Sequence, residues 1–134
     1  MPDRRAALRE LHRVLRPGKC LALGDFALRH APRGSDAEVI DGFRAAGGVA
    51  TLTVIEDILA DLRSAGFELQ SLVDIGDHVR PTMLRHAELF RAARPDLESQ
   101  MGVVGLDEMI SRNEQLADSR AFSYILLGAR RSPV

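Results

Sequence analysis

The chain has 134 residues, of which 46% are hydrophobic and 28% are charged, a profile typical of one soluble globular domain of ordinary size. Its single cysteine cannot form an internal disulfide or a cysteine-rich metal site. The longest apolar runs are too short to span a bilayer, and no leader of charged and then apolar residues is apparent. We therefore expect one domain over residues 1–134, in a cytoplasmic protein that does not associate with membranes.

The net charge of −1 conceals an uneven distribution. Residues 1–33 carry eight Arg or Lys against three acidic residues, whereas the rest of the chain carries ten against sixteen. The first basic residues recur at helical spacing and lack interleaved aromatic residues, which favours a solvated helix face over a surface that binds nucleic acid. We expect no nucleic-acid partner.

The first half of the chain alternates helix and strand. An apolar stripe predicts a helix over residues 3–16, which Pro17-Gly18 stops. The short apolar run from Lys19 to Phe26 then predicts a buried strand, with Cys20 inside it and inert. A second apolar stripe predicts a helix from about residue 35 to Ala46, stopped by Gly47-Gly48.

The second half continues the alternation. Thr53 and Glu56 have the spacing of a capping box, and the apolar stripe after them predicts a third helix, which Gly66 ends. A strand over residues 67–75 follows. Two further helical segments and a last strand complete the chain, over residues 81–94, 106–117 and 121–129.

The three predicted strands form a poor sheet by themselves. Each is apolar enough to need cover on both faces, and such strands normally lie among neighbours on both sides. The first helix also has no preceding strand from which to cross over. These patterns predict the second half of a doubly wound α/β domain whose first half is absent.

The segment Arg13-Val14-Leu15-Arg16-Pro17-Gly18-Lys19 is followed by a predicted strand that ends in Asp25-Phe26. This motif resembles a segment of class I S-adenosylmethionine-dependent methyltransferases, in the branch that includes ubiquinone and sterol enzymes. Further segments resemble the rebeccamycin-type O-methyltransferases of natural-product sugars and small molecules: Asp41 to Val49, Val73 to Ile75 with Arg80-Pro81, Gly105 to Ile110, and Tyr124 to Arg130. Together they cover essentially the whole chain.

The resemblance implies that this chain supplies strands 5, 6 and 7 of a Rossmann-like methyltransferase fold, with the last strand antiparallel between the other two. Its helices would form a cap on the acceptor side. The glycine-rich turn and the ribose-binding acid that hold S-adenosylmethionine in the family are missing, so the cofactor would bind only if an N-terminal half were supplied by another chain or a homo-oligomer. A cofactor-free cyclase, isomerase or ligand-binding protein derived from this fold is the alternative.

Asp25 is the strongest candidate for a catalytic residue. It lies at the carboxyl end of a predicted strand, where ligands collect in open α/β sheets. The resemblance implies that it orients or activates a histidine base carried by the absent half. His30, in the next loop, is a candidate substitute proton acceptor. A carboxylate that caps a turn and a solvated loop histidine remain the alternative interpretations of these two residues.

An apolar pocket for a small-molecule acceptor is a further expectation. Its candidate residues are aromatic, methionine or arginine side chains, namely Phe26, Arg80, Met83, Phe90 and Met101. Ordinary helix packing explains the same residues. His78 and His86 do not share a helix face, so we expect no metal site. A bare sheet edge would invite pairing, so we also expect a dimer or another assembly.

Overall fold

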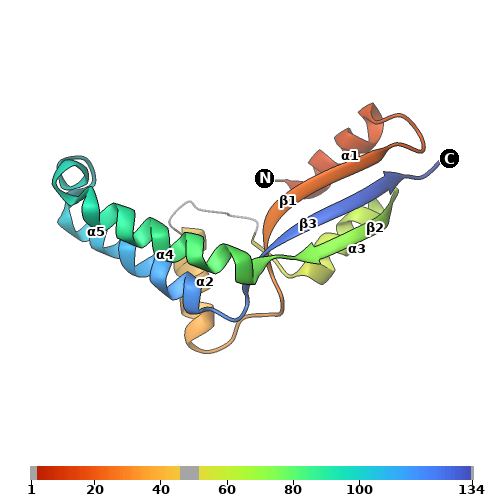
Figure 1. Ribbon diagram of the computed structural model, residues 1–134. Coiled ribbons are helices and arrows are strands. Elements are labelled where there is room, and N and C mark those ends of the chain that lie inside the picture. The colour runs from red at the N-terminus through yellow and green to blue at the C-terminus, as the bar shows by residue number, and fades with distance from the viewer. Residues whose placement is uncertain (1–2, 46–51, 134) are drawn as a thin grey trace.

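The computed structural model describes residues 3–45 and 52–133 of the chain (Figure 1). The elements follow one another as α1 (Arg4–Val14), β1 (Cys20–Leu28), α2 (Ser35–Ala45), α3 (Ile55–Ser64), β2 (Phe67–Asp74), α4 (Gly76–Ala92), α5 (Arg94–Asp118) and β3 (Phe122–Arg131). None of the helices in these ranges is long and apolar enough to cross a membrane. The predicted stop at Gly47-Gly48 lies outside the described residues.

The three strands form one sheet in the order β1-β3-β2. β3 lies in the middle and is antiparallel to both neighbours, with Asp25 opposite Ile125 on one side and Asp74 opposite Ile125 on the other. β1 and β2 therefore run parallel to each other, and their carboxyl ends lie at the same end of the sheet. This order confirms the expected insertion of the last strand between the other two.

Two helices, α1 and α3, cover one face of the sheet. Their apolar stripes pack against the side chains that point to that face, in a core formed by Leu8, Ala27, Ile58, Leu62, Phe67, Ile125, Leu127 and Ala129. His12 is half-buried at the rim of this core, with its ring 5.4 Å from that of Phe67. Gly66 ends α3 with a φ of 88° before the chain turns into β2, as its position in the sequence predicts.

The two covering helices are also joined by charge. Asp61 of α3 is buried and accepts hydrogen bonds from Arg4 at 2.6 Å and from Arg5 at 2.7 Å. Burial alone would raise the pKa of this carboxyl, but the hydrogen bonds and charges of the two arginines outweigh it and lower the pKa. The side chain of Arg4 is only 14% exposed. Arg4 is therefore not part of the solvated basic face that was expected for the first helix.

The opposite face of the sheet is covered by described elements only at the end where β1 and β2 finish. There, α2, α4 and α5 pack over Leu28 and Phe122. Towards the other end the side chains are small or apolar and no described element lies over them. We call these residues the open face: Ala22, Gly24, Ser71, Val73, Leu126 and Gly128.

Cys20 corrects one expectation. Its side chain is exposed, not buried. In the register with β3 it belongs to the same side as Ala22 and Gly24, and it is the first residue of β1. The apolar run predicted a strand that is covered on both faces. Cys20 lies on the face that no described element covers, so its side chain is exposed.

The helices α4 and α5 form a hairpin that extends away from the carboxyl ends of the strands (Figure 1). Ala87, Leu106 and Ile110 form its own small core. Both helices begin earlier than the sequence predicts: Pro81 lies inside α4, and α5 starts twelve residues before the expected position, with a break at Gly102, where φ is 74°.

The start of α3 also differs from the expectation. The helix begins after Val54, and no side chain caps it. Thr53 donates instead to the carboxylate of Asp57 at 3.3 Å. The expected capping box with Glu56 is therefore wrong, because the helix starts one residue later than the motif requires.

Candidate functional site

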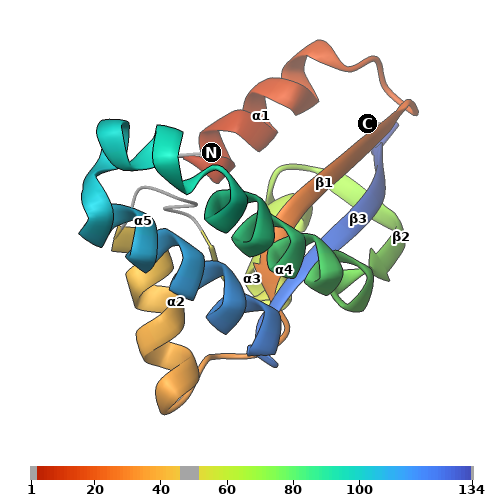
Figure 2. The ribbon, with the colours of Figure 1, turned by 60° about the vertical axis from the view of Figure 1, so that its left-hand side comes forward.

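Three groups of elements meet at the carboxyl ends of β1 and β2. The parallel strands end there, β3 starts between them, and α2, α4 and α5 gather around this end of the sheet (Figure 2). Ligands of open α/β sheets bind at this position because the strand ends and the following loops leave a crevice. The candidate site is therefore built around the last residues of β1 and β2.

Asp25 is half-buried near the end of β1. One carboxylate oxygen accepts a hydrogen bond from the backbone N–H of Phe26 at 2.9 Å. The second oxygen makes no hydrogen bond with the described residues. In the register with Ile125, the side chain belongs to the face that α1 and α3 cover, whereas Phe26 belongs to the opposite face. The carboxylate thus fixes a backbone group at the strand end and keeps one oxygen free.

His30 lies in the loop after β1 and is exposed. Its ring Nδ1 is 3.2 Å from the carbonyl oxygen of Ala31. The side chain contacts its own loop, and no hydrogen bond joins it to Asp25. The two candidate catalytic residues are therefore near each other in the chain but are not brought together as a pair.

Four aromatic side chains form a cluster on the other side of the strand ends. The ring of Phe26 stacks on Phe122 at 5.3 Å and meets the edge or face of Tyr124 at 5.0 Å and of Phe43 at 6.4 Å. Such pairs stabilise beyond their buried area. The cluster forms an apolar wall between the helices and the open face, and it includes one of the predicted acceptor residues.

The other predicted acceptor residues are dispersed. Met83 is buried in the same apolar cluster as Phe26, whereas Phe90 packs in the hairpin core. Met101 is 37% exposed at the far end of the hairpin, beside the break at Gly102. Arg80 is held at the base of α4 by an ion pair with Asp77 and a hydrogen bond to the carbonyl of Ala117. The structure thus brings Phe26 and Met83 into one cluster and places the other three elsewhere.

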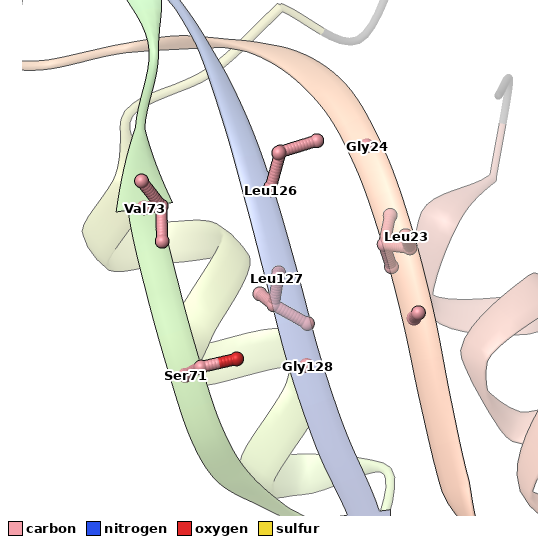
Figure 3. Close-up of a pocket in the computed structure, with 8 residues that line it drawn as sticks. Leu23, Gly24, Ser71, Val73, Leu126, Leu127 and Gly128 are labelled. Atoms are coloured by element: carbon pink, nitrogen blue, oxygen red, sulfur yellow. The ribbon is translucent and has the colours of Figure 1, made fainter.

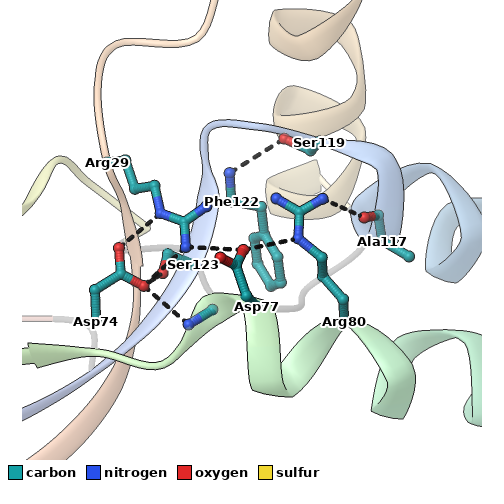
Figure 4. Close-up of polar contacts among 9 residues, drawn as sticks. Arg29, Asp74, Asp77, Arg80, Ala117, Ser119, Phe122 and Ser123 are labelled. Atoms are coloured by element: carbon teal, nitrogen blue, oxygen red, sulfur yellow. Dashed lines mark hydrogen bonds and ion pairs between the residues drawn. The ribbon is translucent and has the colours of Figure 1, made fainter.

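An ionic junction joins the strand ends to the base of α4 (Figure 4). Asp74, the last residue of β2, accepts hydrogen bonds from Arg29 at 2.6 and 3.0 Å, from the hydroxyl of Ser123 at 2.5 Å and from the N–H of Gly76 at 2.9 Å. The Arg29 guanidinium holds the pKa of this carboxyl far below its usual range, against the opposing effect of burial. Asp74 is therefore ionised and fully engaged.

Asp77 extends the junction into the helical hairpin. Its carboxylate lies between Arg29 and Arg80, at 3.2 Å from each, and the two arginines lower its pKa. Arg80 donates further to the carbonyl of Ala117 at 2.8 Å, near the end of α5. The junction therefore ties β1, β2, β3 and both helices of the hairpin together.

The sequence analysis did not single out this junction. Asp74 is the last residue of β2, and it lies at the end of a strand expected from the sequence just as Asp25 does, so the same positional signal could have identified it. Arg29 and Ser123 gave no signal, since they lie 45 and 49 residues away from Asp74 in the chain. Asp61 also could have been found, because it follows Ile58 by three residues and so lies on the buried stripe of α3.

A shallow groove of about 430 Å³ runs over the open face (Figure 3). Its floor contains Gly24 and Gly128, and Leu126 and Val73 rise from it. A Cβ at Gly24 would lie 2.8 Å from the Tyr124 hydroxyl oxygen, and one at Gly128 would lie 2.6 Å from the Ser71 hydroxyl oxygen. Both glycines therefore let a neighbouring side chain lie low against the sheet.

The turn between β2 and α4 is filled by the ionic junction. Gly76 lies where β2 passes into α4, the kind of junction at which nucleotide-type cofactor cradles form. However, a Cβ there would lie 2.3 Å from the Ser123 hydroxyl oxygen and 2.9 Å from Arg29 Nη2, so the space belongs to the ionic junction. Nor do the described residues bring three His, Cys, Asp or Glu side chains together as a metal would require.

Two curated relatives match nearly the whole chain. The 27-O-demethylrifamycin SV methyltransferase of Amycolatopsis mediterranei (strain S699) is 33% identical over 131 residues, which cover 98% of this chain and 48% of that protein. Methyltransferase GfsG of Streptomyces halstedii is 31% identical over 129 residues, which cover 96% of this chain and 45% of that protein. The chain thus spans about half the length of these relatives. No protein-family model matches the sequence.

Solved structures match to the same extent. The [4+2]-cyclase SpnF is 29% identical, with a TM-score of 0.72, and the match covers 96% of this chain and 45% of SpnF. A SAM-dependent methyltransferase from Thiobacillus denitrificans, solved with S-adenosyl-L-homocysteine, is 15% identical with a TM-score of 0.61; the match covers 96% of this chain and 52% of that one. The chain has the fold of the C-terminal half of a Rossmann-like class I methyltransferase, and the two curated relatives are methyltransferases.

Proposed function

We propose that this chain is the C-terminal portion of a small-molecule O-methyltransferase of natural-product biosynthesis, within the rebeccamycin-type branch. It supplies the acceptor side, and a partner half binds S-adenosylmethionine. The observation that carries the proposal is the match of 98% of the chain, at 33% identity, to half of the rifamycin methyltransferase. The chain matches only about half the length of each of these relatives, which supports a second half, on another chain or in a homo-oligomer, that completes the cofactor site.

In this proposal, the chain's own residues bind and orient the acceptor. Phe26 and its aromatic neighbours offer an apolar wall at the strand ends, and Met83, in the same cluster, can adapt to the acceptor's shape. Arg80 acts as a positioning residue, because its guanidinium is already paired with Asp77 and Ala117. Phe90 and Met101 extend the apolar surface along the hairpin.

Asp25 is the proposed catalytic contribution of this half. Its free carboxylate oxygen can orient a base on the partner half, while the oxygen bonded to the Phe26 N–H fixes the side chain. His30 is the proposed proton acceptor within this chain, since its exposed ring lies in the loop that follows the same strand. Removing a proton from a hydroxyl acceptor is the step that such groups accelerate.

A second function is supported by one observation. SpnF, a [4+2]-cyclase, is 29% identical to this chain and matches 96% of it. We propose as the alternative a cofactor-free cyclase, isomerase or ligand-binding protein. The same apolar wall would then fold or hold a natural-product intermediate without methyl transfer.

Native mass spectrometry distinguishes the two. The purified chain is measured with and without S-adenosylmethionine, alone and after coexpression with the half of the rifamycin methyltransferase that this chain does not match. We expect the cofactor's mass only in the mixed complex, together with formation of S-adenosylhomocysteine when 27-O-demethylrifamycin SV is added. Cofactor bound to the chain alone would contradict the need for a partner half, and none in the mixture would favour the cofactor-free alternative.

Asp25→Asn tests the catalytic assignment in the complex that turns over. The amide keeps an oxygen for the Phe26 N–H but removes the charge, so we expect turnover to fall by about 100-fold or more with unchanged complex formation. Asp41→Asn is the matched control, because this carboxylate is 71% exposed on α2 and pairs only with Arg44 among the described residues. Equal turnover of the two variants would remove Asp25 from the site.

A further inference from the structure

We propose that the hydroxyl of Tyr124 is a polar contact for the acceptor, and that it selects a largely apolar molecule that carries a carbonyl, ether or hydroxyl oxygen. In this arrangement the molecule lies against the aromatic wall with its oxygen at the phenol. The inference rests on the acceptor-binding role of the proposed function, and it adds a residue that determines which acceptor is bound.

Tyr124 lies where the aromatic cluster meets the groove of the open face. Its side chain is half-buried and meets the ring of Phe26 edge to face, with the ring centres 5.0 Å apart and the planes at 90°. The two residues are opposite each other in the register of β1 and β3, so both side chains belong to the side of the sheet that carries the open face. The carbon part of the Tyr124 side chain is therefore held in the apolar wall.

A glycine makes room for the phenol. A Cβ at Gly24 would lie 2.8 Å from the Tyr124 hydroxyl oxygen, 3.1 Å from its Cε1 and 3.3 Å from Leu126 Cδ2. The hydroxyl thus lies directly over Gly24 and beside Leu126, two residues that line the groove (Figure 3). The backbone at Gly24 does not have a positive φ, so the glycine provides space and not a special chain conformation. A larger residue there would displace the phenol from the end of the groove.

The hydroxyl keeps its hydrogen-bonding capacity for a ligand. It makes no hydrogen bond within residues 3–45 and 52–133. A tyrosine hydroxyl can both donate and accept a hydrogen bond, and it usually has a partner where the ring is buried. Its neighbours include the carbon atoms of Leu126 and Phe26. One polar atom in an apolar wall is the arrangement by which ligand pockets fix the orientation of the molecule that they bind.

The surroundings of the phenol decide which class of molecule fits. No residue that lines the groove is charged, and Leu126 and Val73 are 45% and 51% exposed on it. A charged ligand would lose hydration here without compensation. A hydrocarbon would leave the phenol without a partner, and a site built to bind an oxygen discriminates against an analogue that lacks it. A largely apolar molecule with an oxygen at the phenol meets both conditions.

The test measures binding to the full chain, with 27-O-demethylrifamycin SV, the acceptor that also tests the proposed function, as the probe. Tyr124 is the only tyrosine of the chain, so tyrosine labelled with carbon-13 at Cζ gives a single NMR resonance that reports hydrogen bonding at this hydroxyl. We expect this resonance to shift as the probe is added. Tyr124→Phe keeps the ring in the wall and removes only the oxygen, so we expect binding about tenfold weaker, measured from amide chemical shifts.

Gly24→Ala tests the geometry without changing the phenol itself. The added methyl group displaces the hydroxyl, so we expect a loss similar to that of Tyr124→Phe and no further loss when the two substitutions are combined. Gly42→Ala is the matched control, because a Cβ there meets nothing within 4 Å, and it should bind as the parent does. Thermal melts compare the folding of the variants, and Tyr124→Phe alone decides if Gly24→Ala does not fold.

Each outcome decides the proposal. Unchanged affinity of Tyr124→Phe overturns it, as does a parent chain that does not bind the probe. A carbon-13 resonance that stays in place while the probe binds, or additive losses in the combined variant, would overturn it as well. Binding that depends on Tyr124, without methyl transfer in the coexpressed complex described above, would leave the contact intact and contradict only the proposed function.

Discussion

The two faces of the sheet are built from the same three strands and differ in what covers them. On the face packed by α1 and α3, Ile125 and Leu127 are 1% and 3% exposed. On the opposite face Leu126, between them in sequence, is 45% exposed. The strands therefore carry apolar residues for two layers of cover, and this chain supplies one and a part of the other. The apolar residues on the second face therefore indicate that the complete fold covers this face, although the described residues do not.

The sharpest way to test this comparison is to truncate the neighbouring residues of β3. Ile125→Ala should lower the free energy of unfolding by about 4 kcal/mol, because it leaves a cavity in a packed core. Leu126→Ala should lower it by less than about 1 kcal/mol, as expected for a partly exposed site without a covering layer. Urea denaturation of the isolated chain measures both. Equal losses would show that another layer covers the open face in solution.

A second test concerns the covered face alone. Asp61→Ala leaves Arg4 without its partner in the seam between α1 and α3, so the free energy of unfolding should fall by about 3 kcal/mol. Glu56→Gln, at an exposed position of the same helix, is the control and should cost less than about 1 kcal/mol. If Asp61→Ala costs no more than this control, the two covering helices do not depend on the ion pair. Thermal and urea melts give the comparison.

The smallest expected effect belongs to the ionic junction, and it depends on pH. Asp74→Asn should lower the free energy of unfolding by about 2 kcal/mol at pH 7, since it removes the charge that Arg29 and Ser123 bind. The folded-state pKa of Asp74 lies below the unfolded value of about 3.9, so its contribution is complete above about pH 5 and declines as the pH falls through that value.

Urea denaturation at several pH values checks this dependence. The difference between the parent and Asp74→Asn should shrink between about pH 5 and pH 2. Glu88→Gln, which breaks an exposed pair with Arg85 on α4, should cost less than about 1 kcal/mol. If the difference in free energy of unfolding between the parent and Asp74→Asn stays constant down to pH 2, the charge of the Asp74 carboxylate does not contribute to stability.

The sequence predicted the strands better than the helices of the hairpin. Each strand was expected within two residues of its observed bounds, because short apolar runs between turn signals mark buried strands well. Both helices of the hairpin were predicted to be shorter than they are, because Pro81 was interpreted as a helix start and residues 94–105 lack a strong apolar stripe. In the structure Pro81 lies inside α4, and α5, which packs against α4, already begins at Arg94.

From the sequence, site residues could be predicted only where their position near a strand end marks them as candidates. Asp25 and Phe26 were identified because the strand was expected to end there and a strand end in an α/β sheet is a functional position. In the structure β1 continues to Leu28, so the two residues lie two to three positions before its end. The partners of Asp74 could not be inferred, because Arg29 and Ser123 reach it only through the strand order β1-β3-β2. The five predicted acceptor residues, four of them apolar and one an arginine, lie on three different parts of the fold, and no pattern in the sequence encodes that separation.

The strand order has a consequence for how the chain folds as it is made. β3 follows β1 and β2 in the sequence, yet it is the strand with which each of them pairs. While a ribosome is still synthesising the hairpin, the two earlier strands have no partner in this sheet, and their backbone groups must stay hydrated or be held by α1 and α3. Pairing then spans more than a hundred residues between Cys20 and Arg130, and contacts this distant in sequence form slowly. The interval before the last strand emerges is therefore when this polypeptide is most exposed to aggregation and most dependent on chaperones.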